Sequence, residues 1–261
     1  MDLSLAGKSA LVCGSSQGIG LACAVEISRL GASCTLLARN GPALQKALTF
    51  LQPGEGRTHG FLVADFSRPE EVRAVAGQYL KAHEVHILVN NTGGPGPGPV
   101  SGAEEEQFLD AFRQHLICNH IITRAVLPGM KKAGYGRIIN ILSTSVKAPI
   151  PNLGVSNTTR WAVAAWSKTL AGEVAHLGIT VNNVLPGSTR TARLKSLLAQ
   201  LAEKQQMNQK DIEDQWIKKI PAGRFAEPEE IAAMVAFLAT PAASFVNGAS
   251  IPVDGGQTLS L

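Results

Sequence analysis

The sequence is poor in cysteine and aromatic residues. Aromatic residues make up 5% of the 261-residue chain, and no two of its four cysteines show CxxC or metal-ligand spacing. Cys13 and Cys34 fall in apolar runs typical of strands, while Cys23 and Cys118 fall in stretches with helical spacing. We therefore expect four small, buried side chains in a reducing compartment, and neither a disulfide framework nor a metal site.

The chain also lacks a concentrated charge and a long apolar run. Its formal net charge is +4, but Lys and Arg are scattered and no basic run is interleaved with aromatic residues, so we expect no nucleic-acid partner. No apolar stretch approaches the ~20 residues of a membrane span. The first expected strand follows the N-terminus almost at once, without room for a signal peptide, which favours a cytoplasmic location.

Short apolar runs alternate with segments of helical spacing along the whole chain. The helical segments include residues 19–30, 69–81, 104–130 and 160–177. The apolar runs are SALVCG, SCTLLA, GFLVAD, HILVNN, GRIINIL, ITVNNVL and ASIPV. Because runs that are apolar on both faces suit a parallel sheet buried under helices, the pattern predicts an α/β fold. We expect one doubly wound parallel sheet of about seven strands, with helices on both faces, in a single domain spanning residues 1–261.

Two segments depart from this alternation. Residues 93–102, GGPGPGPVSG, are too rich in Gly and Pro for regular structure, and indicate an ordered loop at the carboxyl end of the sheet, where such folds bind ligands. Residues 188–220 form a polar, largely helical insertion. That insertion is either a lid over the substrate or an amphipathic pair of surface helices.

A glycine array between the first strand and the first helix indicates a dinucleotide site of the Rossmann type. The string CGSSQGIG allows tight turns without Cβ atoms, so that a pyrophosphate can approach the helix N-terminus. Ser15 and Ser16 offer further hydrogen-bond donors. The residues assigned to this loop are Gly14, Ser15, Ser16, Gly18, Ile19 and Gly20.

Arg39 and Asn40 end the second strand, where a protein that chooses NAD often has an acidic residue for the ribose 2′-hydroxyl. A guanidinium is well matched to a 2′-phosphate. The alternative is a solvated loop arginine. The position favours NADP(H) over NAD(H).

The motifs that follow in order resemble those of the short-chain dehydrogenase/reductase family. They are Asp65-Phe66 after the third strand, NNTG at residues 90–93, GRIINILS at 136–143, NNVLPGSTRT at 182–191, and the terminal GRFAEPEEIA and ASIPVDGG. The resemblance covers nearly the whole chain. It implies that Asp65 contacts the adenine, and that Asn91 and Gly93 contact the ribose beside it. It also implies that Pro186, Gly187 and Thr191 contact the nicotinamide end.

The resemblance breaks at the catalytic positions, where family members usually carry Asn, Ser and Tyr-x-x-x-Lys. The serine is present as Ser143, but Ser156 stands at the tyrosine position, Arg160 at the lysine position and His115 at the asparagine position. An alkanol is a far weaker acid than a phenol, and arginine does not deprotonate, although Arg160 can still bind the nicotinamide ribose. These departures resemble a divergent branch of 3-oxoacyl-(acyl-carrier-protein)-reductase-like proteins.

Two residues are candidates for the proton transfer that the tyrosine would perform, and a third can orient the substrate. His115 is a chemically suitable proton donor if it faces the cofactor, although helical histidines are more often packing residues. Lys147 is a second donor candidate, with a solvated lysine as the alternative. Ser143 can orient a carbonyl group, or cap the strand end.

Two functions therefore remain open. The first is an NADPH-dependent reductase of a small carbonyl or alcohol substrate, with an unconventional proton donor or a water chain. The second is a nucleotide-binding homologue without dehydrogenase turnover, acting as a sensor, a partner-binding protein or a non-redox enzyme. The resemblance of the last helix and the helix around Trp161 and Trp166 to the family's assembly surfaces implies a homotetramer, which sedimentation at micromolar concentration would test.

Overall fold

The computed structural model describes residues 1–260, which form a seven-stranded parallel sheet. Its order is β3-β2-β1-β4-β5-β6-β7, and all neighbouring pairs are parallel. The reversal of strand order between β1 and β4 makes the sheet doubly wound, which confirms the predicted fold class. The strands are β1 (Ser9–Cys13), β2 (Ser33–Ala38), β3 (Gly60–Val63), β4 (Ile87–Asn90), β5 (Gly136–Ile141), β6 (Ile179–Pro186) and β7 (Ser250–Val253).

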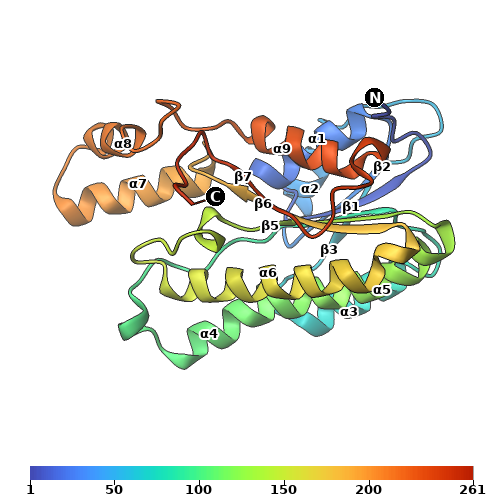
Figure 1. Cartoon of the computed structure of the whole chain (residues 1–261), viewed down its shortest axis with the longest axis horizontal. Helices are drawn as coiled ribbons and strands as arrows, with labels where there is room; N and C mark the ends of the chain where they lie inside the picture. Colours follow the sequence, from blue (N-terminus) through green and yellow to red (C-terminus); the bar gives the residue numbers. More distant parts are fainter. Residues whose placement is uncertain (261) are drawn as a thin grey trace.

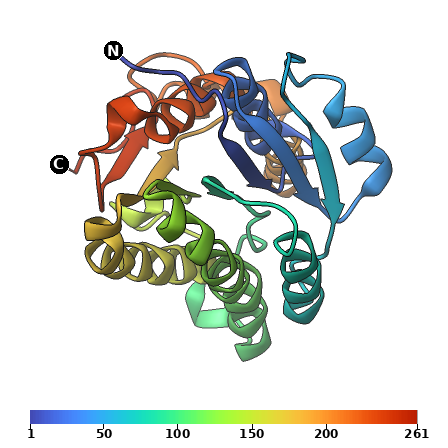
Figure 2. The same cartoon turned by 90° about the vertical axis from the view of Figure 1, so that its right-hand side faces the viewer.

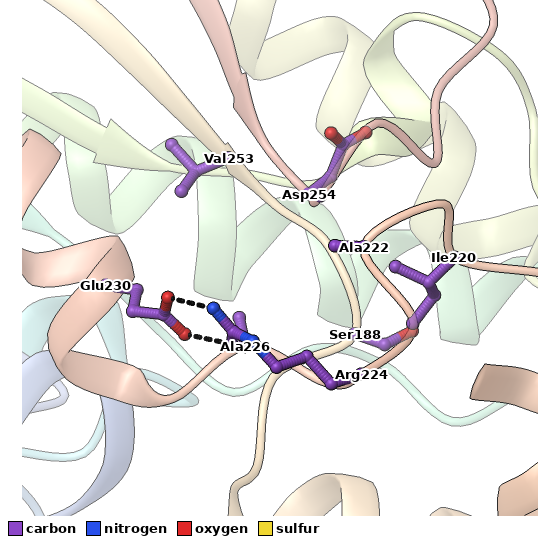
Figure 3. Close-up of a pocket in the computed structure, with 9 residues that line it drawn as sticks. Ser188, Ile220, Ala222, Arg224, Ala226, Glu230, Val253 and Asp254 are labelled. Atoms are coloured by element: carbon purple, nitrogen blue, oxygen red, sulfur yellow. Dashed lines mark hydrogen bonds and ion pairs between the residues drawn. The ribbon is translucent and has the colours of Figure 1, made fainter.

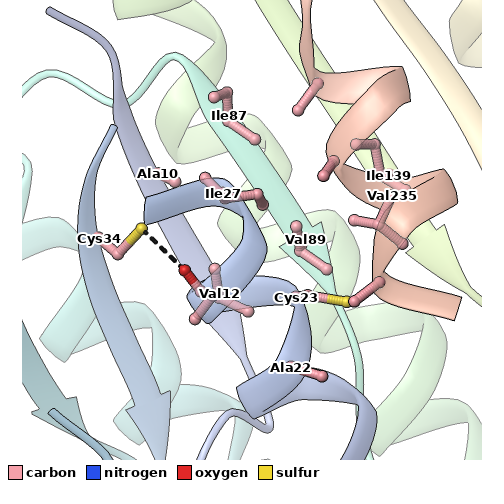
Figure 4. Close-up of a cluster of buried hydrophobic side chains, with 14 of the residues drawn as sticks. Ala10, Val12, Ala22, Cys23, Ile27, Cys34, Ile87, Val89, Ile139 and Val235 are labelled. Atoms are coloured by element: carbon pink, nitrogen blue, oxygen red, sulfur yellow. Dashed lines mark hydrogen bonds between the residues drawn. The ribbon is translucent and has the colours of Figure 1, made fainter. Parts of the chain in front are cut away.

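Helices cover both faces of the sheet (Figures 1 and 2). One face packs against α1 (Gly18–Arg29), α2 (Gly41–Leu48) and α9 (Pro228–Ala239), and the other against α3 (Pro69–Tyr79), α5 (Cys118–Ala133) and α6 (Gly154–Val174). Ala10 and Val12 point into the first layer, which Figure 4 shows, and Leu11 and Cys13 into the second. This alternation explains why the strands are apolar on both faces.

All four cysteines are buried, as expected. Burial raises the pKa of the Cys34 thiol to about 12, and this thiol donates to the carbonyl of Ala24 at 3.5 Å. They therefore act as packing side chains.

The predicted helix over residues 104–130 is interrupted. The chain forms α4 (Glu105–Phe112), then a π-helical turn, η2 (Arg113–Ile117), and then α5, which continues to Ala133. A π-turn widens the helix by one residue without removing its apolar spacing, so the sequence pattern did not reveal it. Helix α6 begins at Gly154, six residues before the predicted start, and α2 was not predicted. Short turns complete the chain: η1 (Val100–Gly102), η3 (Thr144–Val146), η4 (Ala175–Leu177) and η5 (Pro241–Ala243).

The segment 188–220 contains two helices, α7 (Ala192–Gln205) and α8 (Gln209–Ile217). They project from the end of the sheet at which the strand arrows point (Figure 1). They share a small core of their own, made by Leu194, Leu198, Ala202, Ile212, Ile220 and Phe225. Among residues 1–260, no helix is long and apolar enough to cross a membrane.

The turn from β1 to α1 passes very close to the end of β4. A Cβ atom on Gly14 would lie 2.4 Å from the Asn91 carbonyl oxygen, and one on Gly20 would lie 2.3 Å from the Gly14 carbonyl oxygen. Gly14 and Gly18 also have φ near +60°, at +59° and +58°. The Asn91 amide nitrogen donates to the carbonyls of Cys13 and Gly14, at 3.3 and 3.1 Å. A side chain at Gly14 would therefore force the turn away from the end of β4, and one at Gly20 would force α1 away from the turn.

The close approach predicts opposite effects for two glycine substitutions. Gly20→Ala should lower the free energy of unfolding by about 1–3 kcal/mol, because its Cβ meets backbone that cannot move away. Gly77→Ala, inside α3 where a Cβ meets nothing within 4 Å, should raise it by about 0.5–1 kcal/mol. Urea unfolding followed by circular dichroism measures both, and equal effects of the two substitutions would contradict the assignment.

Candidate functional site

The start of α1 is open to an anion. Its N-cap residue, Gln17, makes no capping side-chain bond, and its first turn carries no acidic residue, so its free N–H groups and positive dipole end are available. Ser16 makes no hydrogen bond with its side chain within residues 1–260. Ile19 packs beneath the turn against the buried core.

Ser15 differs from the expectation that it offers a donor to a ligand. Its hydroxyl donates to the Val12 carbonyl at 2.7 Å and accepts from the Leu37 amide at 3.1 Å. The side chain is fully buried. Because a serine has one hydroxyl hydrogen, this donor is already used to tie β1 to β2.

The end of β2 carries an exposed cation. Arg39 has no ion pair or hydrogen bond through its side chain within the part of the chain that is described. The Ser67 amide donates to the Asp65 carboxylate at 2.9 Å, and this bond is the largest cause of the lowered pKa of Asp65, with the Arg39 charge a smaller cause.

Asn40 instead caps α2, with its side chain accepting from the Ala43 amide at 3.0 Å. The Phe66 side chain packs in the core layer of α3 and α5.

The start of α7 lies opposite the glycine loop. Thr191 accepts from the Leu194 amide at 3.3 Å, and its methyl group lies 3.4 Å from the position of a Cβ on Gly18. Pro186 ends β6, and Gly187 lies so close to Asp254 that a Cβ would approach its Cα to 2.7 Å. Gly93 lies in open space on the loop after β4. The glycine loop, the end of β6 and the start of α7 therefore come together. The Asn91 side-chain amide, in contrast, is already used in hydrogen bonds to backbone carbonyls.

A second group of predicted residues gathers around the start of α6, which packs against the turns η2 and η3. Ser143 accepts from the Ser145 amide at 3.1 Å. Ser156 is only 7% exposed, and its hydroxyl has no hydrogen-bond partner among residues 1–260. Arg160 donates from Nη1 to the Ile141 carbonyl at 2.7 Å, while its buried Nε has no partner there. Lys147 is half-buried at the end of η3.

His115 lies on the π-turn and is buried, with a hydrogen bond of 2.5 Å between its Nδ1 and the Thr92 hydroxyl. Burial, and to a lesser degree the charges of Arg160 and Arg193, lower its pKa to about 2. The imidazole is therefore neutral at neutral pH, which disfavours the hypothesis that it donates a proton as imidazolium.

Arg193 is the residue of this region that sequence reasoning missed. It is the second residue of α7, and its Nη2 donates to the Pro95 carbonyl at 3.2 Å. The guanidinium lies so close to Gly94 that a Cβ there would be 2.5 Å from Nη1. A cation in the first turn of a helix opposes the helix dipole, and that was the signal available in the sequence.

Two cavities lie at this end of the molecule. One, of about 200 Å³, is lined by Pro95, Gly96, Gln107, Asp110, Ala111, Gln114, His115 and Val155. The other, of about 80 Å³, contains the Arg224–Glu230 pair, whose two bonds of 2.6 Å Figure 3 shows. In the second cavity Arg224 is paired with Glu230, whereas the first cavity is the larger of the two and is lined by His115, so the first is the better candidate for substrate. No cluster of His, Cys, Asp and Glu within residues 1–260 could hold a metal ion.

Comparisons with known proteins show the family and the fold of the chain. The family model described as Enoyl-(Acyl carrier protein) reductase matches residues 14–258. The 3-oxoacyl-(acyl-carrier-protein) reductase of Pseudomonas aeruginosa is 35% identical over 262 residues, which cover 99% of this chain and 100% of the relative. The structure of L-sorbose reductase from Gluconobacter frateurii, solved with NADPH and L-sorbose, is 31% identical, with a TM-score of 0.93 over 100% of both chains. That of the NADPH-dependent reductase YwfH, involved in bacilysin biosynthesis, is 30% identical, with a TM-score of 0.91 over 97% of this chain and 99% of that chain.

The buried, neutral His115 predicts a specific pH dependence of stability. An unfolded histidine has a pKa near 6.5. Since the folded pKa is about 2, the unfolded state binds a proton that the folded state does not, and stability is lost as pH falls below about 6.5. When the pH is lowered from 7 to 5, the free energy of unfolding of the wild type, measured with urea, should fall by about 2 kcal/mol more than that of His115→Asn.

The exposed His176→Asn is the matched control, and it should lose as much stability as wild type over the same interval. Parallel curves for wild type and His115→Asn would show that His115 is not neutral in the folded protein.

Proposed function

The chain belongs to the short-chain dehydrogenase/reductase family, and we propose that it is an NADP(H)-dependent oxidoreductase of a carbonyl or alcohol substrate, similar to the 3-oxoacyl reductases. The observation that carries the proposal is the open start of α1 behind a glycine loop, together with the unpaired Arg39 at the end of β2. A nucleotide held there would supply a hydride to the carbonyl carbon, and the protein would deliver a proton to the carbonyl oxygen.

The geometry suits a dinucleotide lying across the carboxyl ends of the strands. The N–H groups of α1 and the Ser16 hydroxyl receive the pyrophosphate, and Arg39 receives the 2′-phosphate. Asp65 and the residues around Asn91 and Gly93 border the adenosine end. The turn from Pro186 to Thr191 borders the nicotinamide end, and Arg160 holds the ribose there. The L-sorbose reductase solved with NADPH, and the description of YwfH as NADPH-dependent, support this assignment.

Proton delivery takes place without the usual phenol. Ser143 orients the carbonyl oxygen, and the unpartnered hydroxyl of Ser156 holds a water molecule that passes the proton. Lys147 is the better candidate for replenishing that proton, since His115 is neutral. Helices α7 and α8, which share a small core of their own, act as a lid that excludes bulk water when substrate is bound.

The second candidate function is nucleotide binding without turnover. It is favoured by Ser156 and Arg160 at the positions of the tyrosine and lysine. In that case the cleft reports cofactor occupancy to a partner, or performs non-redox chemistry.

The Arg39 assignment predicts a selective loss of affinity. Wild type should bind NADPH more tightly than NADH in a fluorescence titration. Arg39→Ala should lower the affinity for NADPH by about 10- to 100-fold, with little effect on the affinity for NADH. Arg68→Ala is the control, because that guanidinium is already paired with Glu71 at 2.7 Å. Equal affinities in wild type would refute the preference for NADPH, and binding of neither nucleotide would refute the dehydrogenase proposal.

The double substitution Ser156→Tyr with Arg160→Lys separates the two functions. If the protein is a reductase of the proposed type, the added phenol fills the space of the water, and the rate of NADPH oxidation falls by roughly 10-fold or more relative to wild type. New activity in the double variant of a silent wild type supports the second function instead. Steady-state rates on a panel of carbonyl compounds measure the difference.

A further inference from the structure

Two arginines near the larger cavity, the buried Arg160 and the solvent-exposed Arg193, have no acidic partner within residues 1–260. Neither Arg160 nor Arg193 forms an ion pair with any residue from 1 to 260, although nine other pairs occur there. Arg160 is only 8% exposed, and its Nε is buried without a hydrogen bond. A buried cation without an anion is costly, so an arrangement of this kind indicates a missing anionic ligand.

The position of Arg193 connects this charge to the cavity of about 200 Å³. Its guanidinium donates to the carbonyl of Pro95, and both Pro95 and His115 line that cavity. The acidic group of the lining, Asp110, is already paired with Arg113 at 2.9 Å. Burial lowers the pKa of Arg160 to about 10, with Arg193 as the second cause, and the group remains a cation at neutral pH.

We propose that Arg193 binds a carboxylate of the substrate, so that the preferred carbonyl compound is an oxo acid. The planar guanidinium can hold a carboxylate through two parallel hydrogen bonds. Arg160, fixed to the Ile141 carbonyl, adds positive charge from the sheet side of the site. The inference rests on the proposed function, because it assigns the substrate class of the same cleft.

A phosphate of the cofactor has the same chemistry and is the competing source of the anion. In the proposed arrangement the free start of α1 and Arg39 already bind the phosphates, whereas Arg193 donates to Pro95 on the loop after β4. The competing source predicts that Arg193 affects nucleotide binding, and the inference predicts that it does not.

The first arm of the test measures binding without turnover. Protein saturated with NADP⁺, which cannot reduce a carbonyl, is titrated calorimetrically with pyruvate, acetoacetate and laevulinate, and with their ethyl esters. At least one acid should bind about 10-fold or more tightly than its ester. If no acid binds, or if each ester binds as well as its acid, the inference is wrong.

The second arm uses Arg193→Met, which removes the charge and keeps most of the length, and Arg193→Lys, which keeps the charge. The methionine variant should bind the acid roughly 10- to 100-fold more weakly than wild type does, while its affinities for the ester and for NADPH should change by less than about 3-fold. The lysine variant should recover part of the loss. Arg73→Met, which removes an exposed cation from α3, is the matched control and should leave the affinities for the acid, the ester and NADPH unchanged.

Two outcomes separate the inference from the proposed function. If Arg193→Met lowers the affinity for NADPH and leaves the ratio of the affinities for acid and ester unchanged, the anion is a cofactor phosphate and the inference is overturned. If an acid binds in an Arg193-dependent manner but NADPH is not oxidised, the carboxylate site stands and the reductase proposal fails.

Discussion

The contact between the β1–α1 turn and the end of β4 is the constraint on which the site depends. Two glycines allow backbone to approach backbone where a Cβ would stand 2.3–2.4 Å from a carbonyl oxygen, and the Asn91 amide holds the contact together. The contact lies at the switch point of the sheet, where the strand order reverses. The direction of α1, and with it the position of its free N–H groups, follows from that approach.

Around this fixed point, the protein distributes cations without matching acids. Arg39 and Arg193 are exposed, after β2 and at the start of α7, while Arg160 is buried and donates to the Ile141 carbonyl at the end of β5. Several arginines elsewhere are paired with acidic side chains, as in Arg224 with Glu230. Cations without acidic partners at this end of the sheet favour the binding of an anionic ligand there.

The parts of this arrangement that the sequence predicted are those set by local pattern. Strand positions follow from short apolar runs, and the glycine loop follows from the residue types that its turn requires. The π-turn that carries His115 leaves no trace in the apolar spacing, and the use of the Ser15 hydroxyl depends on a neighbouring strand. Arg193 meets Pro95 across 98 residues, so its role depends on packing that no local pattern encodes.

Trp161 gives the protein a built-in optical reporter. Its indole N–H donates to the Ser145 carbonyl at 2.7 Å, two residues from Ser143, while the side chain remains 48% exposed. Indole emission is sensitive to the loss of a hydrogen bond and to nearby charge. Any rearrangement of the loop after β5 must therefore alter the emission of one of three tryptophans, and the chain's own fluorescence can follow that loop without an added label.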